Sequence, residues 1–345
     1  MGFLAVDMLF RRRFLLGLVV LALALGLVAS VVYLDYRDFL DTPCRVPGSG
    51  FTFTVKPGMG VSDVARELQQ HGVMQSAYYF EAYTRLNGLA SKLKAGEYAV
   101  TPETTPRGLT EQIVNGRVVQ YAMAVVEGWT FQQLRQALSE HPKIAHTLGA
   151  LSDAEIMARL GRPGEHPEGR FFPDTYHFPI GTSDEAFLRR ALAAMDQRLN
   201  HVWSQRRSDL PFNDPYQALI LASIIEKETR LPAERPTIAG VLARRLRKGM
   251  PLQTDPTVIY GLGQAFSGNL RRQDLLADTP YNTYTRKGLP PTPIALPGEG
   301  ALAAAVNPTS GDALYFVATG EGGHAFSATL EEHNRAVRRY QLKAK

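Results

Sequence analysis

One uninterrupted apolar segment, residues 14–34, constrains this chain more than any other feature of its sequence. Apart from Ser30 it contains only apolar residues and glycine. About 20 such residues are enough to cross a bilayer as a helix. The sequence therefore predicts one membrane-spanning helix, and whatever follows it must fold on a single side of the membrane.

The charges that flank this segment predict its orientation. Three arginines, 11–13, precede it, and Asp35, Asp38 and Asp41 follow it. The positive-inside rule then places residues 1–13 in the cytoplasm and the rest of the chain outside. A cleaved signal peptide is the alternative, but the apolar run is longer than the usual apolar region of such a peptide. We expect an uncleaved signal anchor.

Composition narrows the class of protein. The 345 residues are enough for two domains, and a net charge of +5 is spread along the chain without long basic runs. This charge fits an anionic polymer or a membrane surface better than nucleic acid, so we expect no nucleic-acid partner. Cys44 is the single cysteine and the histidines lack an HExxH spacing, so we predict no metal site and no cofactor.

Two domains of α+β type are predicted after the anchor. Residues 35–50 contain prolines and glycines and are expected to form a tether. Residues 51–117 show the order strand, helix, helix, strand, followed by a helix that Thr105 can cap. This pattern resembles a LysM-type carbohydrate-binding module, although many small α+β domains would produce it. Residues 118–345 are expected to form a larger mixed α+β domain.

The larger domain contains a helix, residues 217–229, that is apolar nearly all round and is therefore expected to be buried. It ends in Glu226 and Glu228, which lie about 200° apart on a helical wheel at about 100° per residue. A carboxyl held against apolar side chains has a raised pKa, which suits a general acid. The alternative is that both glutamates form ion pairs with Lys227, Arg230 or Arg235.

Aromatic and polar residues gather in three further segments of this domain. Rings beside carboxylates suit a sugar-binding wall, and polar groups near a buried acid could orient a sugar. Each residue could equally serve structure, for example in an aromatic turn or an Asp-Pro turn. The candidates are Phe172, Asp174 and Tyr176, then Gln253, Thr254, Asp255 and Tyr260, and finally Asn282 and Tyr284. A proline-rich loop, residues 288–300, follows the last pair.

Several of these motifs, in this order, resemble the MltG/YceG-like endolytic murein transglycosylases. The motifs are ASIIEKET at 222–229, LQTDPTVIYG at 252–261, EG at 168–169 with FPDTY at 172–176, YNTY at 281–284, GLPP at 288–291, and YFV at 315–317 followed by GGHAF at 322–326. One departure is Phe172, where some members carry tryptophan; an aromatic residue is retained there.

The resemblance implies a single-pass inner-membrane protein with a LysM-like domain and a periplasmic catalytic domain. It implies endolytic cleavage of the MurNAc-β-1,4-GlcNAc bond in peptidoglycan, leaving 1,6-anhydro-MurNAc ends and terminating or releasing nascent strands. Glu228 aligns with the catalytic glutamate, because Glu-Thr resembles the Glu-Ser of other lytic transglycosylases, and Glu226 is then a supporting residue. The partners implied are glycan strands, the inner membrane and nearby peptidoglycan synthases.

Two other functions remain open at this point. A muramidase-type hydrolase would use water and a second carboxylate, for which Asp174 and Asp255 are the candidates. A membrane-anchored glycan-binding scaffold would need neither glutamate for chemistry. The products formed from peptidoglycan distinguish the first possibility, and the phenotype of a Glu228→Gln variant distinguishes the second.

Overall fold

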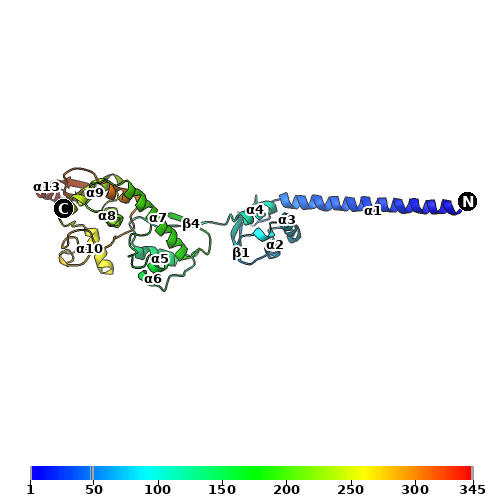
Figure 1. Ribbon diagram of the computed structural model, residues 1–345, viewed down its shortest axis with the longest axis horizontal. Helices are drawn as coiled ribbons and strands as arrows, with labels where there is room; N and C mark the ends of the chain where they lie inside the picture. The colour runs from blue at the N-terminus through cyan, green and yellow to red at the C-terminus, as the bar shows by residue number, and fades with distance from the viewer. Residues whose placement is uncertain (1, 47, 49, 343–345) are drawn as a thin grey trace. The chain divides into compact units, whose positions relative to one another are not determined.

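The computed structural model of this mixed α+β protein describes residues 2–46, 48 and 50–342. The chain divides after Tyr121 into two compact units, 1–121 and 122–345 (Figure 1). Each unit has a hydrophobic core of its own, and we describe each by itself.

Helix α1 (Gly2–Asp41) opens the first unit, and its part from residue 12 onward is long and apolar enough to cross a membrane. The helix continues past the predicted span, so the predicted tether is helical up to Asp41. Leu40 in its last turn is buried, and Arg107 Nε donates to Asp41 Oδ1 at 3.1 Å. These contacts hold the last turns of the helix in place. The helix ends before Pro43, because proline cannot continue it.

The rest of the first unit has the predicted order of strand, two helices, strand and helix. Strands β1 and β2 pair antiparallel with Phe53 opposite Tyr98, and the helices cover them with Val64, Leu68 and Leu109. Thr105 caps α4 as predicted, and α2 has Gly60 at its N-cap. The elements are β1 (Phe51–Val55), α2 (Val61–Gln70), α3 (Ala77–Leu86), a 3-10 turn (Ala90–Lys92), β2 (Gly96–Val100) and α4 (Pro106–Asn115).

The second unit begins with a two-stranded sheet and two short helices. Strand β3 (Tyr121–Ala124) pairs with β4 (Thr175–Phe178). Helix α5 (Phe131–Glu140) starts at Thr130, whose side chain accepts a hydrogen bond from Gln133 N and forms a capping box. Helix α6 (Asp153–Arg159) follows in the segment whose sequence is least regular.

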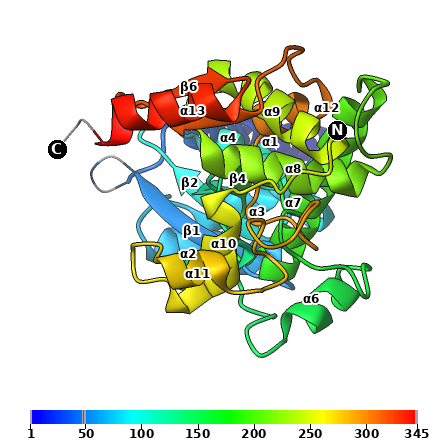
Figure 2. The ribbon, with the colours of Figure 1, turned by 90° about the vertical axis from the view of Figure 1, so that its left-hand side faces the viewer.

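Helix α8 (Pro215–Glu228) is the centre of the second unit, as its apolar sequence predicts. In Figure 2 it lies between α7 (Asp184–Ser204) and α9 (Arg235–Arg247), and it packs against both. Its residues from Ala218 to Ile225 are all buried. Asp214 caps the helix, so that it starts two residues before the predicted boundary.

Helix α12 (Glu299–Val306) packs along α8 and was not predicted from the sequence. Its run of alanines has no helical periodicity of polar and apolar residues, and it directly follows the proline-rich loop. The small side chains of Ala301, Ala304 and Ala305 are buried and allow the two helices to approach closely. The helix is therefore defined by its packing rather than by its pattern.

The C-terminal part of the second unit combines short helices with a hairpin. Strands β5 (Tyr315–Ala318) and β6 (His324–Ser327) pair antiparallel. The other elements are a 3-10 turn (Pro232–Glu234), α10 (Asp255–Leu262), a second 3-10 turn (Gly263–Ala265), α11 (Arg272–Leu276), α13 (Leu330–Val337) and a π-helical turn (Arg338–Leu342).

Candidate active site

The two glutamates at the end of α8 leave the helix in different directions, and Glu226 is fully engaged. Its Oε1 accepts a hydrogen bond from Arg235 Nη2 at 3.2 Å, and its Oε2 accepts one from Gly298 N at 3.0 Å. Its side chain is 6% exposed and that of Arg235 is 11% exposed. Burial raises the pKa of Glu226, while the Gly298 bond and Arg235 oppose that rise. Glu226 thus links α8 to α9 and to the start of α12.

Glu228 has no such partner. In the part of the chain that the structure describes, no hydrogen bond or ion pair reaches its side chain. Burial raises the pKa of Glu228 to about 8, and the negative charge of Asp255 contributes to the rise. The residue is nevertheless partly accessible to solvent. A carboxyl with these properties is protonated at neutral pH and free to donate its proton.

Asp255 and Tyr284 complete the surroundings of Glu228. Asp255 is the first residue of α10, which packs directly against α8. The hydroxyl of Tyr284 donates to Asp255 Oδ1 at 2.5 Å. Burial and this bond raise the pKa of Tyr284, and the charge of Glu228 acts in the same direction. The structure therefore brings these three predicted residues, from two helices and a loop, into one cluster.

Gln253 and Thr254 support the start of α10. Gln253 has φ +54°, the one positive φ of a non-glycine residue in the described chain. Its backbone N–H donates to Thr283 O at 3.0 Å, and its side-chain oxygen accepts from Arg245 Nη1 at 3.1 Å. Thr254 is buried, and its N–H donates to Thr283 Oγ1 at 3.0 Å. Both residues fix the backbone that presents Asp255.

Asn282 shapes the loop that carries Tyr284. Its amide nitrogen donates to three backbone carbonyls, and its side-chain oxygen accepts from Tyr284 N at 2.9 Å. The three carbonyls belong to Asp274, Leu275 and Ala277, at 3.1, 3.1 and 2.7 Å. With 1% of its surface exposed, Asn282 has all its hydrogen-bonding groups occupied within the fold.

The predicted aromatic wall lies largely inside the core. Phe172 belongs to the core cluster around α8, and Arg198 lies over its ring. Tyr176 is buried, and its hydroxyl donates to Phe172 O at 2.7 Å. Asp174 is exposed, and its Oδ1 accepts from Thr175 N at 2.7 Å. These side chains make no contact with Asp255 or Tyr284 through any hydrogen bond of the structure.

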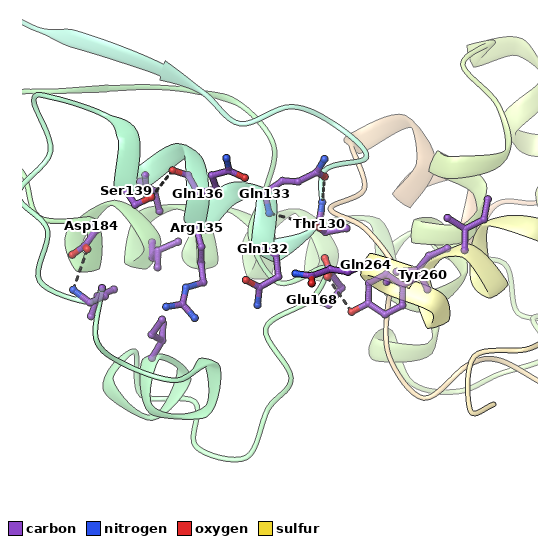
Figure 3. A pocket seen from close by; sticks show the side chains of 18 of the residues that line it. Thr130, Gln132, Gln133, Arg135, Gln136, Ser139, Glu168, Asp184, Tyr260 and Gln264 are labelled. Carbon is purple, nitrogen blue, oxygen red and sulfur yellow. Dashed lines mark hydrogen bonds between the residues drawn. The ribbon is translucent and has the colours of Figure 1, made fainter. Parts of the chain in front are cut away.

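A large cavity, with a volume of about 1310 Å³, lies near the end of α8, but Glu228, Asp255 and Tyr284 are not among the residues that line it. Lys227 and Pro256, the neighbours of Glu228 and Asp255 in the chain, contribute to its wall. The remaining wall comes mainly from α5 and from the end of α10 (Figure 3). Of the predicted site residues, Tyr260 lines this cavity. Among the residues that the structure describes, no group of three or more histidines, cysteines or carboxylates could hold a metal ion.

Glu168 lines the same cavity and was not singled out as a site residue. It is 2% exposed; its Oε1 accepts from Phe131 N at 2.9 Å, and its Oε2 accepts from Tyr260 Oη at 3.1 Å (Figure 3). Burial raises its pKa to about 7. In the sequence Glu168 appears only as part of the EG motif at 168–169, where Gly169 has φ +78° and a Cβ atom would fall 2.5 Å from the Cβ of Pro293.

Comparisons with known proteins show the family to which the chain belongs. Residues 53–339 match the model of the YceG-like family. An endolytic murein transglycosylase of Bacillus subtilis (strain 168) is 30% identical over 333 residues, which cover 91% of each chain. One from Streptococcus pneumoniae (strain D39) is 27% identical, over 91% of this chain and 63% of its own length.

A solved structure has the same fold. The crystal structure of a yceG-like protein from Listeria monocytogenes matches with a TM-score of 0.54 and 31% identity, covering 83% of this chain and 98% of that one. Since the family model and the relatives both span most of the sequence, this chain belongs to the YceG-like family.

Proposed function

We propose that this chain is an endolytic peptidoglycan lytic transglycosylase and that Glu228 is its catalytic acid and base. The relatives named as endolytic murein transglycosylases support the reaction. The observation that carries the residue assignment is the carboxyl of Glu228, which is buried enough to stay protonated near pH 7 and is free of hydrogen bonds. Glu226 lacks this freedom because Arg235 and Gly298 occupy both its oxygens.

The reaction would use one carboxyl group twice. Protonated Glu228 donates to the glycosidic oxygen as the bond from that oxygen to C1 of MurNAc breaks through an oxocarbenium-like state. The carboxylate then removes the proton of the MurNAc C6 hydroxyl, whose oxygen bonds to C1. The product ends in 1,6-anhydro-MurNAc, Glu228 is protonated again, and no water is consumed.

Asp255 and Tyr284 have supporting roles in this proposal. The charge of Asp255 raises the pKa of Glu228, so that the acid keeps its proton. A carboxylate in this position also stabilises positive charge at C1. Tyr284 holds Asp255 through the hydroxyl bond. We assign sugar contacts to Asp255, Tyr284 and Tyr260, and support of the loops to Gln253, Thr254 and Asn282.

A muramidase is the second candidate, because the structure places a carboxylate, Asp255, next to Glu228. In that enzyme Asp255 would activate water, and the products would have reducing ends. Mass spectrometry of digested, purified sacculi decides between the two reactions. We expect 1,6-anhydro ends from the wild-type protein; reducing MurNAc ends would refute the transglycosylase.

The same digestion tests whether the protein is an enzyme at all. Glu228→Gln retains the size of the side chain but cannot exchange a proton, so we expect it to bind sacculi and to release no products. A scaffold would instead keep its cellular function with Gln at position 228. If Glu226→Gln abolished turnover and Glu228→Gln did not, the assignment within the pair would be wrong.

The first unit supports a membrane-bound location. We propose that α1 anchors the protein in the bacterial inner membrane with residues 1–13 in the cytoplasm and the second unit in the periplasm. Leu40 and Asp41, packed against the first unit, favour a helix that is retained rather than cleaved. The order β1, α2, α3, β2 supports a LysM-like module, which would place the enzyme near glycan strands and peptidoglycan synthases.

A further inference from the structure

Glu168 is a buried carboxyl to which the proposed reaction gives no task. It is more deeply buried than Glu226, yet it has no arginine or lysine as an ion-pair partner among the described residues. Its two oxygens instead accept hydrogen bonds from different parts of the second unit, the N-terminus of α5 and Tyr260 of α10. Burying a carboxyl in this way costs free energy unless its hydrogen bonds offset the cost. The buried position of Glu168 therefore needs a reason, and the two segments that it joins suggest one.

Glu168 contacts Tyr260, and Tyr260 belongs to the same short helix, α10, as Asp255. The two residues are five positions apart on α10, which corresponds to a rise of about 7.5 Å. Tyr260 also meets the ring of Tyr281 edge-on, with ring centroids 4.9 Å apart. A helix of eight residues has little stability of its own, so its orientation depends on contacts like these.

The other end of α10 is held by hydroxyl groups. Thr254, Thr257 and Thr283 form a buried cluster, in which Thr257 Oγ1 and Thr283 Oγ1 are 2.9 Å apart. The helix is thus attached at its beginning by this threonine cluster and at its end by Glu168. An attachment at one end alone would leave the helix free to tilt about that end.

We propose that Glu168 is a positioning residue for the transglycosylase reaction: through Tyr260 it holds α10 so that Asp255 stays beside Glu228. The inference rests on the proposed function of Glu228 and adds a residue of the cavity wall to the machinery. Without the Glu168 bond, the far end of α10 keeps only the contact of Tyr260 with the Tyr281 ring, so the helix can tilt about the threonine cluster and turn the Asp255 side chain away from Glu228. The proton affinity of Glu228 then falls even though neither residue of that pair has changed.

The test measures the titration of Glu228 in full-length protein in detergent. The 13C signal of its labelled carboxyl, assigned by its loss in Glu228→Gln, gives the pKa directly, and the alkaline limb of kcat/KM on uncrosslinked glycan strands gives it through activity. Asp255→Asn removes the neighbouring charge and should lower the pKa by about one unit. Glu168→Ala and Tyr260→Phe should each lower it by about half a unit, with kcat reduced up to about 100-fold.

Rescue and coupling separate positioning from general damage. In Glu168→Gln the amide can still accept from Phe131 N and bond to the Tyr260 hydroxyl. The pKa of Glu228 in this variant should therefore remain within about 0.2 unit of its wild-type value. In the double variant Glu168→Ala/Asp255→Asn, the shift should equal that of Asp255→Asn alone, because the charge to be positioned is absent.

Asp184 offers a matched control. It lines the same cavity and is 6% exposed, and it accepts hydrogen bonds from Thr147 N and Leu148 N without reaching α10. Asp184→Asn should lower the stability of the second unit and leave the pKa of Glu228 unchanged. If Glu168→Ala also left the pKa of Glu228 unchanged, the threonine cluster alone would position Asp255, and the inference would be wrong. The NMR titration decides this even if the products prove to be those of a different reaction.

Discussion

The two sides of the last turn of α8 offer a direct comparison. On one side Glu226 is bound by Arg235 and by the backbone of Gly298. On the other side Glu228, two residues later, has its pKa raised by burial to about 8 and yet has no hydrogen-bond partner in the described chain. Two identical side chains on one helix thus acquire different properties from what surrounds them. Burial alone therefore does not distinguish the proposed catalytic acid from its neighbour, whereas the absence of a fixed partner does.

A third glutamate, Glu168 in the wall of the cavity, can be compared with these two. Glu168 is buried and has a pKa raised to about 7, but its oxygens are occupied by Phe131 N and the Tyr260 hydroxyl. It resembles Glu228 in proton affinity and Glu226 in its bonds. A raised pKa therefore does not by itself separate a reacting group from a positioning one.

The largest expected effect is on turnover. Glu228→Gln should lower kcat by at least about 1,000-fold, because general acid–base catalysis by a positioned side chain contributes about 10²–10⁴-fold and here one residue serves both steps. Glu226→Gln should retain measurable turnover, since its role is to link helices. The measurement is the rate at which 1,6-anhydro ends appear in digested sacculi. Equal losses in the two variants would remove the distinction between the two sides.

The next largest effect is on stability, and here the loss is expected at Glu226 rather than at Glu228. Glu226→Ala should lower the free energy of unfolding of the second unit by about 2 kcal/mol, because it removes the closer of the two carboxylates beside the buried guanidinium of Arg235, which keeps Glu127 at 3.5 Å. Both tryptophans, Trp129 and Trp203, lie in this unit, so their fluorescence reports its unfolding in urea. A loss below about 1 kcal/mol would mean that Glu226 is not the link that its contacts indicate.

Glu228→Gln should stabilise the second unit at alkaline pH. The folded pKa of Glu228 is about 8, above its ordinary value of 4.5. The proton-linked contribution of this raised pKa is therefore complete below pH 4.5 and is lost as pH rises through 8. Glutamine stays neutral throughout, so at pH 9 the variant should exceed wild type by about 1–2 kcal/mol, with the difference shrinking toward pH 5. Urea titrations at both pH values measure it; a difference independent of pH would contradict the raised pKa.

The smallest effect concerns the residue between the two glutamates. Lys227 is exposed, and its Nζ donates to Gly128 O at 3.2 Å. Lys227→Met should change the free energy of unfolding by less than about 0.5 kcal/mol. A larger loss would show that the whole turn, rather than Glu226 in particular, stabilises this end of α8. The same urea titration serves as the measurement.

Much of the second unit could be predicted because local patterns there agree with the tertiary structure. The apolar residues of α8 allow no position other than the core, and its helical period alone separates the directions of Glu226 and Glu228. In the first unit, likewise, Thr105 caps its helix as its sequence predicts. Helix α12 was missed because its alanines carry no periodic signal, and its existence depends on packing against α8.

The candidate site was predictable in its types of residue and less so in their roles. Asp255 and Tyr284 lie beside Glu228, whereas the rings of Phe172 and Tyr176 lie in the core. Nothing in a linear pattern distinguishes an aromatic ring that faces a cavity from one that fills a core. Glu168 escaped notice for the same reason, because its neighbours are 37 and 92 positions away in the chain.

The sequence by itself determined the apolar helix of residues 14–34, the central buried helix and the order of motifs that indicates the family. Each of these depends on local composition or period, which a chain carries without reference to its fold. The tertiary structure decided which glutamate is bound and which is free, because Arg235, Gly298 and Asp255 reach α8 from other elements. Proton affinity depends on distance and burial in space, and only the folded chain defines those.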